Sequence, residues 1–372
     1  MLRRRSFSAE GSCEVEIISV HLESEPLIDA FAYRGFMYGW NFENQLVIYS
    51  VNSLIDDLSV AYGSAGLSAA YALFCSRGIG ATSEMTTAFR NRSSGEARTL
   101  RLSSEPLVRA ENIAPFRHVI DMQITYDRLY LATETGLFIM PLRTAQLIDN
   151  RSMSPKLERE GECIAVNTGL RAVGASFGTE GLYVVANEVS SAIGPRTSWF
   201  LPVTSVRSSL GASTLVNFPS QEEAQTIPTT VAHGTDGRAV ALSEVLVGDS
   251  ESFSSRTVGA NGYIFWDARY RRMFDVMQRL ADTRGRWFTD SKDQEADIGQ
   301  KPIKVISAAF TGNYSLILET TDGIVVVRDG EDQLVQGGPS ISMRTYRNSW
   351  RYRRLLTATS KTGVWLHASL DG

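Results

Sequence analysis

Three stretches of the sequence share one pattern, and they decide the fold. They are HVIDMQITYDRLYLATETGLFIM at His118–Met140, KVISAAFTGNYSLILETTDGIVVV at Lys304–Val327 and YRRLLTATSKTGVWLH at Tyr352–His367. In each stretch a strand-like run ends in a tight polar pair before a glycine, and a second apolar run follows. Glycine supplies the positive φ that short hairpin turns demand. The pattern predicts repeated antiparallel hairpins, with turn glycines at Gly136, Gly323 and Gly363.

Looser copies of this pattern cover most of the remaining chain. They lie at Asp29–Val51, Val60–Gly80, Arg171–Gly194 and Thr229–Leu242. Seven units are expected, whose third strands begin at Gln45, Ile79, Leu137, Thr197, Tyr263, Ile324 and Val364. Helical periodicity is scarce, and its best candidate is Arg269–Thr283, with apolar residues at helical spacing.

These strand–turn–strand units, with one Trp-Asp dipeptide at Trp266-Asp267, resemble a β-propeller of the broad WD40-like or Kelch-like kind. The resemblance implies an all-β fold: a single β-propeller of seven blades, each of mostly four antiparallel strands. The lone N-terminal strand Glu14–Val20 is expected to pair with Val364–His367 and so close the ring. The rival fold is a pair of β-sandwiches split near Leu210, in which the two ends need not meet.

The expected domain organisation is an N-terminal tail at 1–13 followed by a propeller domain at 14–372. Polar insertions are expected near 206–226, 248–261 and 282–300, which are rich in serine or carry mixed charge. Loops on a rigid scaffold are common positions for contacts with partners.

Composition excludes several classes of protein. With 43% hydrophobic and 21% charged residues among 372, the chain is neither disordered nor fibrous. It has no apolar run long enough to span a membrane, so no membrane partner is expected. Three distant cysteines, Cys13, Cys75 and Cys163, form neither a disulfide framework nor a zinc motif, which favours the reducing cytoplasm. A net charge of -4 does not favour nucleic-acid binding by the whole molecule.

Signals for catalysis are weak. Gly174–Gly178 matches Gly-x-Ser-x-Gly, but a predicted strand follows it where a nucleophile elbow needs a helix. No histidine spacing is typical of a metal site, and structural roles in turns are expected for His118 and His233. The sequence therefore predicts a non-catalytic protein without catalytic residues, cofactor or metal.

The most informative polar segment is SMRTYRNSWRYRR at Ser342–Arg354, where arginines alternate with aromatic residues. Such a mixture is typical of protein-binding surfaces. The predicted partner-binding residues are Arg344, Arg347, Trp350, Arg351, Arg353 and Arg354, with a smaller cluster at Arg269, Arg271 and Arg272. The alternative is that Tyr346, Trp350 and Tyr352 fill the core of the last blade while the arginines face solvent.

The function that these observations favour is a docking or scaffold subunit, which mediates protein–protein interactions in a cytoplasmic multi-protein complex. Arginine forks would pair with an acidic surface on one or more partner proteins. The first alternative is a nucleic-acid-binding subunit that uses the strip 342–354, because arginines and stacking aromatics also suit single strands. The second alternative is a propeller-type hydrolase or lyase.

Overall fold

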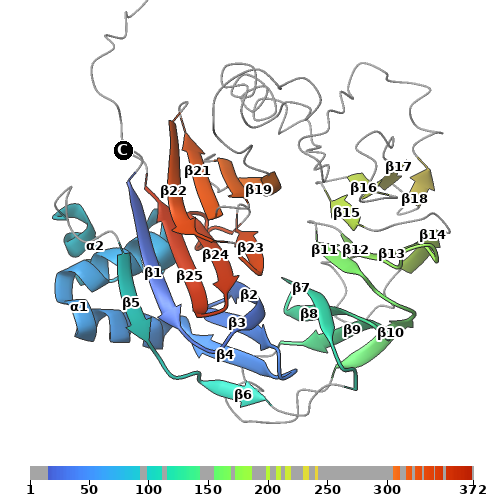
Figure 1. The fold of residues 1–372 in the computed structure, drawn as a ribbon, viewed down its shortest axis with the longest axis horizontal. Helices are drawn as coiled ribbons and strands as arrows, with labels where there is room; N and C mark the ends of the chain where they lie inside the picture. The colour runs from blue at the N-terminus through green and yellow to red at the C-terminus, as the bar shows by residue number, and fades with distance from the viewer. Residues whose placement is uncertain are drawn as a thin grey trace, which may run out of the picture.

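Figure 1 shows the computed structural model of the chain. The structure describes residues 16–92, 99–110, 115–142, 155–168, 172–186, 198–201, 207–210, 214–218, 229–233, 239–241, 305–310, 316–320, 323–328, 331–338, 340–346 and 349–370. Within these ranges the strands form six sheets. No helix in this part of the chain is long and apolar enough to cross a membrane.

Small antiparallel sheets of four strands are the repeating unit. The first sheet has the order β2 (Leu27–Tyr33), β3 (Phe36–Asn41), β4 (Leu46–Ser50) and β6 (Val108–Ala110). The second sheet contains β7 (Val119–Thr125), β8 (Arg128–Thr133), β9 (Gly136–Pro141) and β10 (Lys156–Glu160). The third contains β11 (Ala165–Thr168), β12 (Ala172–Ser176), β13 (Leu182–Ala186) and β14 (Ser198–Leu201). Consecutive strands are therefore hydrogen-bonded neighbours. The exception is β6, which pairs with β4 although more than fifty residues separate the two strands along the chain.

Two further sheets repeat this order. One contains β15 (Arg207–Leu210), β16 (Thr214–Phe218), β17 (Thr229–His233) and β18 (Ala239–Ala241). The other contains β19 (Val305–Phe310), β20 (Leu316–Thr320), β21 (Gly323–Arg328) and β22 (Glu331–Gly337). The sheets fan out around a common centre, toward which β2, β7, β11 and β23 (Ser342–Thr345) lie (Figure 1). This radial succession of sheets is a β-propeller.

The last sheet joins the two ends of the described chain. Its order is β23, β24 (Leu355–Ser360), β25 (Gly363–Ser369), β1 (Ile17–Glu23) and β5 (Thr99–Ser103). Strand β1 pairs antiparallel with β25, with Val20 opposite Leu366. The predicted pairing of the N-terminal strand with the C-terminal strand is confirmed. A lone strand pairs here because its backbone groups would otherwise remain at an open edge.

The core lies between neighbouring sheets. Tyr38 and Trp40 of the first sheet pack with Leu129 and Met140 of the second. Residues of the second sheet then pack with the third in the same way, as Tyr130 does with Val173. Burial of these apolar faces is the main stabilising contribution for such stacked sheets.

The prediction of strands at Val60–Gly80 is wrong, because the structure has a helical insertion there. It contains α1 (Val51–Phe74), a short 3-10 helix η1 (Ser76–Gly78) and α2 (Ser83–Arg90). The Ser50 hydroxyl caps α1 by accepting a hydrogen bond from the Ser53 N–H. Gly63, which the strand interpretation placed in a turn, instead bends α1 with φ of 57°. No third strand therefore begins at Ile79.

Two details of the other predictions also change. Residues 206–226, expected to be an insertion, include the paired strands β15 and β16.

The turn glycines Gly323 and Gly363 have the expected positive φ, at 138° and 132°. Gly136 does not have the predicted positive φ. Glycine is needed there for a different reason, because a Cβ would lie 2.4 Å from the carbonyl oxygen of Arg159. The predicted unit at Thr229–Leu242 contains β17 and β18 of the fourth sheet. Its third strand, predicted from Tyr263, lies outside the described residues, as do the helix at 269–283, the insertions at 248–261 and 282–300 and the tail at 1–13.

Candidate functional site

The segment Ser342–Arg354 combines buried and exposed side chains in two described parts, Ser342–Tyr346 and Ser349–Arg354. Tyr346 and Tyr352 are buried, whereas the Trp350 side chain projects from the surface with 69% exposure. The alternative that all three aromatic residues fill the core is therefore correct for the two tyrosines and wrong for Trp350. The two parts have different roles and are described in turn.

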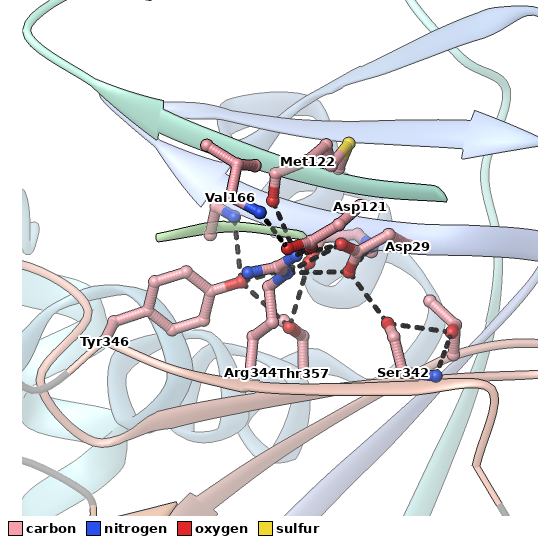
Figure 2. Close-up of polar contacts among 11 residues, drawn as sticks. Asp29, Asp121, Met122, Val166, Ser342, Arg344, Tyr346 and Thr357 are labelled. Atoms are coloured by element: carbon pink, nitrogen blue, oxygen red, sulfur yellow. Dashed lines mark hydrogen bonds and ion pairs between the residues drawn. The ribbon is translucent and has the colours of Figure 1, made fainter. Parts of the chain in front are cut away.

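Arg344 on β23 points toward Asp29, Asp121 and Met122 (Figure 2). Its guanidinium forms ion pairs with Asp29 on β2 and Asp121 on β7, and the second of these measures 2.9 Å. Its Nε donates to Asp29 Oδ1 at 2.7 Å, and its Nη2 donates to the Met122 carbonyl oxygen at 2.5 Å. The side chain of Arg344 is 13% exposed and that of Asp29 is 4% exposed.

Further hydrogen bonds extend this network to β11 of the third sheet. The second carboxylate oxygen of Asp121 accepts from the Val166 N–H of β11 at 2.9 Å. Asp29 also accepts from its neighbour's N–H, at Ala30, and from the Ser342 hydroxyl, both at 2.8 Å. Strands β2, β7, β11 and β23 are thus connected through one guanidinium and two carboxylates. We name these three residues, Asp29, Asp121 and Arg344, the central ion network.

The central ion network corrects the role predicted for Arg344. Burial by itself would lower the pKa of the Arg344 guanidinium, but the carboxylates of Asp29 and Asp121 outweigh that effect and raise the pKa above its usual value. Arg344 therefore stays charged and serves internal contacts. Its Nε and Nη2 atoms already donate to residues of the first and second sheets, so they are not available to a partner.

The second part of the segment, Ser349–Arg354, is held by hydrogen bonds to the helical insertion and to the turn between β2 and β3. The Ser76 N–H donates to the Arg351 carbonyl oxygen at 3.0 Å, and the Gly35 N–H donates to the Tyr352 hydroxyl at 2.7 Å. The side chain of Arg351 returns to α1, where its Nε donates to the carbonyl oxygen of Phe74 at 3.1 Å. A cation at the C-terminal end of a helix is favourable because the helix dipole is negative there. These hydrogen bonds hold Arg351 and Tyr352, the two residues after Trp350, against the scaffold.

Trp350 is accompanied by a second arginine, which comes from η1. The guanidinium carbon of Arg77 lies 5.4 Å from the centre of the Trp350 ring, a cation–π distance. In the part of the chain that the structure describes, the Arg77 guanidinium has no ion pair. Ile79, two residues further on, is 42% exposed. We name Arg77, Ile79, Trp350 and Arg351 the docking surface.

The remaining predicted partner-binding residues fall into two groups. Arg353 and Arg354 are half-buried, and the main-chain N–H of Arg354 donates to the Ser76 hydroxyl at 3.3 Å. Arg347 and the cluster Arg269, Arg271 and Arg272 lie outside the described residues. Sequence reasoning missed Arg77 and Ile79, because they lie in the segment that was interpreted as a strand.

The described part of the chain contains no cluster of three His, Cys, Asp or Glu side chains that could hold a metal ion. Ser176 of the Gly-x-Ser-x-Gly string lies buried in β12, and β13 follows it. His118 is exposed, and its main-chain N–H donates to the Glu134 carboxylate at 3.1 Å. His233 is placed on β17. Cys75 and Cys163 are buried free thiols, and burial raises the pKa of Cys75 to about 11.

No family model matches the sequence, and no curated protein matches it. Among solved structures, the chain is similar to the β-propeller domain of Cps50 (Swd1) from Myceliophteria thermophila, with a TM-score of 0.45 and 9% identity over 94% of this chain and 98% of that one. It is similar to Sqt1 of Saccharomyces cerevisiae, with a TM-score of 0.46 and 11% identity over 95% and 98% of the two chains. The N-terminal domain of Nup159 gives 0.44 and 8% over 97% and 98%. The β-propeller assignment rests on the chain's own strand order.

Proposed function

We propose that this protein is a non-catalytic docking or scaffold subunit that binds protein partners in a cytoplasmic multi-protein complex. The observation that carries the proposal is the position of Trp350, which is 69% exposed beside Arg77. Tryptophan and arginine are the residues most enriched among those that dominate binding energy at protein interfaces. A large aromatic side chain that is held outward by an ordered loop is well suited to such a role.

The order of the loop matters as much as its composition. Ser349 and Tyr352 are joined by a hydrogen bond of 3.0 Å from the Tyr352 N–H to the Ser349 hydroxyl, so Trp350 lies inside a closed turn. The contacts of Arg351 and Tyr352 with α1 and the β2–β3 turn hold this turn on the scaffold. A binding loop that is already in one conformation loses little entropy on binding.

The charge around Trp350 favours an acidic partner. Apart from Arg344, which pairs with Asp29 and Asp121, the segment 342–354 contains four arginines and no acidic residue, and Arg77 adds another cation. Arginine forks pair with carboxylates through two parallel hydrogen bonds. We therefore expect the partner to present carboxylates around an apolar group that packs on Trp350 and Ile79.

The architecture of the proposed scaffold is a seven-bladed propeller. Six sheets lie in the described part of the chain, and we expect a seventh in the stretch 242–304 between β18 and β19, which is long enough for a propeller unit of about 40–50 residues. Pairing of β1 with β25 supports closure of the ring by the N-terminal strand. Nearly the whole chain, from residue 14 to 372, would then form one domain.

Loss of the docking surface is expected to abolish partner binding without unfolding the protein. In the double variant Trp350→Ala, Arg77→Glu, recovery of the partner at physiological salt should fall at least tenfold, since interface anchors contribute about 2 kcal/mol or more each. The melting temperature should hardly change, because both side chains are exposed. Affinity purification with quantitative mass spectrometry after nuclease treatment measures the first quantity, and calorimetry measures the second.

The matched control is Phe42→Ala, which removes an aromatic side chain that is 62% exposed elsewhere on the surface. This variant should keep every partner. Equal recovery from the wild type and the double variant would refute the proposed docking surface. Nucleic acid that binds through this surface, with affinity falling steeply as salt rises, would replace the proposal by the nucleic-acid alternative.

A further inference from the structure

The last sheet of the propeller ends in an additional strand with a distinctive edge. The order β25-β1-β5 makes β5 the outer strand, and in the described part of the chain no further strand lies beside it. Strand β5 runs parallel to β1, with Arg101 opposite His21. Leu100 and Leu102 are buried toward the helices, whereas Thr99, Arg101 and Ser103 are exposed.

One tyrosine hydroxyl takes the place of a neighbouring strand at this edge. The Tyr62 hydroxyl accepts a hydrogen bond from the Arg101 N–H at 3.1 Å and donates to the Arg101 carbonyl oxygen at 2.6 Å. The N–H and C=O of one strand residue point to the same side, so those of Thr99 and Ser103 point the same way as those of Arg101. Tyr62 therefore occupies the middle of a row of outward-facing backbone groups.

The side chain that covers the edge is itself accessible. Tyr62 is 37% exposed and directly precedes Gly63, where α1 is bent. Val60, two residues before Tyr62 in α1, is 89% exposed. A single side chain at a bend can leave the edge without disturbing the buried face of α1, which begins with Val51, Leu54 and Leu58.

A shallow groove of about 420 Å³ adjoins the same strand. It is lined by His21, Glu23, Ser24, Arg101, Thr362 and Trp365. In the described part of the chain no hydrogen bond or ion pair involves the Arg101 guanidinium, although its main chain is bonded to Tyr62. A cation without a partner beside an open strand edge offers both a backbone and a charge for recognition.

We propose that β5 is a strand-addition site, covered by Tyr62, for an extended segment of a partner protein with an acidic residue opposite Arg101. Displacement of the Tyr62 hydroxyl frees the Arg101 N–H and C=O, and the partner's backbone replaces it in an added strand. The acidic side chain enters the groove and pairs with the Arg101 guanidinium. Glu23 lies opposite Ser103. A second acidic residue of the partner, placed next to Ser103, would therefore be repelled by the Glu23 carboxylate.

Strand addition supplies affinity through the backbone, while the groove supplies selectivity for charge. The site shares no residue with the docking surface, so a test of one proposal does not depend on the outcome of the other. A second copy of this chain is the competing occupant, because exposed strand edges also pair with one another.

The test uses a synthetic probe, acetyl-Thr-Thr-Leu-Glu-Leu-Thr-Thr-amide, which repeats the alternation of β5 with glutamate at its centre. On the full chain, Tyr62→Phe should tighten binding of this peptide about tenfold, because the competing hydroxyl bonds are lost. Adding Arg101→Glu should weaken binding at least tenfold and reverse the preference toward the same peptide with lysine at its centre. Fluorescence anisotropy measures the affinities.

Hydrogen exchange supplies a second measurement. The Arg101 amide should exchange faster in Tyr62→Phe and become protected when the peptide binds. The matched control Tyr126→Phe removes the hydroxyl of another partly exposed tyrosine, whose residue exposure of 39% is close to that of Tyr62, and should leave peptide binding unchanged. Trp350→Ala should also leave it unchanged.

Three results would overturn the proposal. The first is absence of peptide binding to wild type and Tyr62→Phe up to about 1 mM, where the binding energy is only about 4 kcal/mol. The second is binding that is insensitive to Arg101→Glu. The third is concentration-dependent self-association of Tyr62→Phe without peptide, which would assign the edge to a second copy.

Discussion

Replacing Arg344 with methionine is expected to lower the free energy of unfolding by about 3–5 kcal/mol, because it removes the cation that pairs with the buried Asp29 carboxylate and the half-buried Asp121 carboxylate. Asp29 is 4% exposed, and its carboxylate faces Asp121 across the position of the guanidinium. Folded proteins are typically stable by about 5–15 kcal/mol, so this loss is a large part of the total. Urea denaturation at neutral pH, followed by tryptophan fluorescence, measures it.

Two further variants separate charge from geometry at the central ion network. Arg344→Lys keeps the cation but cannot bond Asp29 and Asp121 through a planar fork, so an intermediate loss is expected. Asp29→Asn combined with Arg344→Met should recover part of the stability, because one unpaired carboxylate is removed. Both results follow if the cost comes from unpaired buried charge.

The matched control is Arg34→Met, which removes a surface ion pair between Arg34 and Asp127. Those side chains are 66% and 41% exposed, and such pairs contribute at most about 1 kcal/mol. If Arg344→Met and Arg34→Met destabilise the protein equally, the central ion network does not hold the first, second and last sheets together.

Mild acid is expected to destabilise the protein through His367. Burial lowers the pKa of His367 to about 3, while the value in the unfolded chain is near 6.5. The unfolded state therefore binds a proton first, and stability is lost as the pH falls below 6.5. At pH 4.5 the loss from this residue is about 2–3 kcal/mol, from about 1.4 kcal/mol for each pH unit.

The surroundings of His367 explain why the neutral form is preferred. Its Nδ1 lies 2.8 Å from the Ser19 hydroxyl, and its Nε2 lies 3.3 Å from the Gln336 side-chain oxygen. One donor and one acceptor satisfy a neutral imidazole, and Trp365 stacks against the ring at 5.7 Å. Each neighbour named here is uncharged.

The variant His367→Gln isolates this contribution. Its hydrogen-bonding groups suit the same two partners, and it cannot titrate. Between pH 7.0 and pH 4.5 the wild type should lose about 2–3 kcal/mol more than the variant in urea denaturation. His21, whose pKa is also lowered by burial, remains in both proteins and cancels in the comparison. Equal losses in the two proteins would show that the His367 imidazole is not held neutral.

Local sequence signals predicted the sheets where strand, turn and strand follow one another. The hairpins at Gly323 and Gly363 have the expected positive φ, and β1 pairs with β25 as the need to cover an open edge implies. The same reasoning failed at Val60–Gly80, because glycines were taken as turn signals. Buried Val51, Leu54 and Leu58 already show helical spacing, and the alanine-rich stretch that follows favours a helix.

The strip Ser342–Arg354 shows where local information ends. Local sequence does not distinguish Arg344 from Arg351, because both are arginines among aromatic residues. It also does not distinguish the exposed Trp350 from the buried Tyr352. Asp29 and Asp121, which hold Arg344 inside, are more than two hundred residues away along the chain. Arg77 and Phe74, which flank Trp350 and Arg351, come from a helical insertion near the other end.

Local sequence patterns were enough to predict the repeated hairpins and the pairing of the first and last described strands. Those features depend on neighbouring residues and on the need of every strand for a partner. The folded arrangement was needed to show which arginine lies at the centre, which aromatic side chain is exposed, and that Tyr62 covers the edge of β5. These choices depend on contacts between distant segments, and no local pattern records which segment will lie opposite.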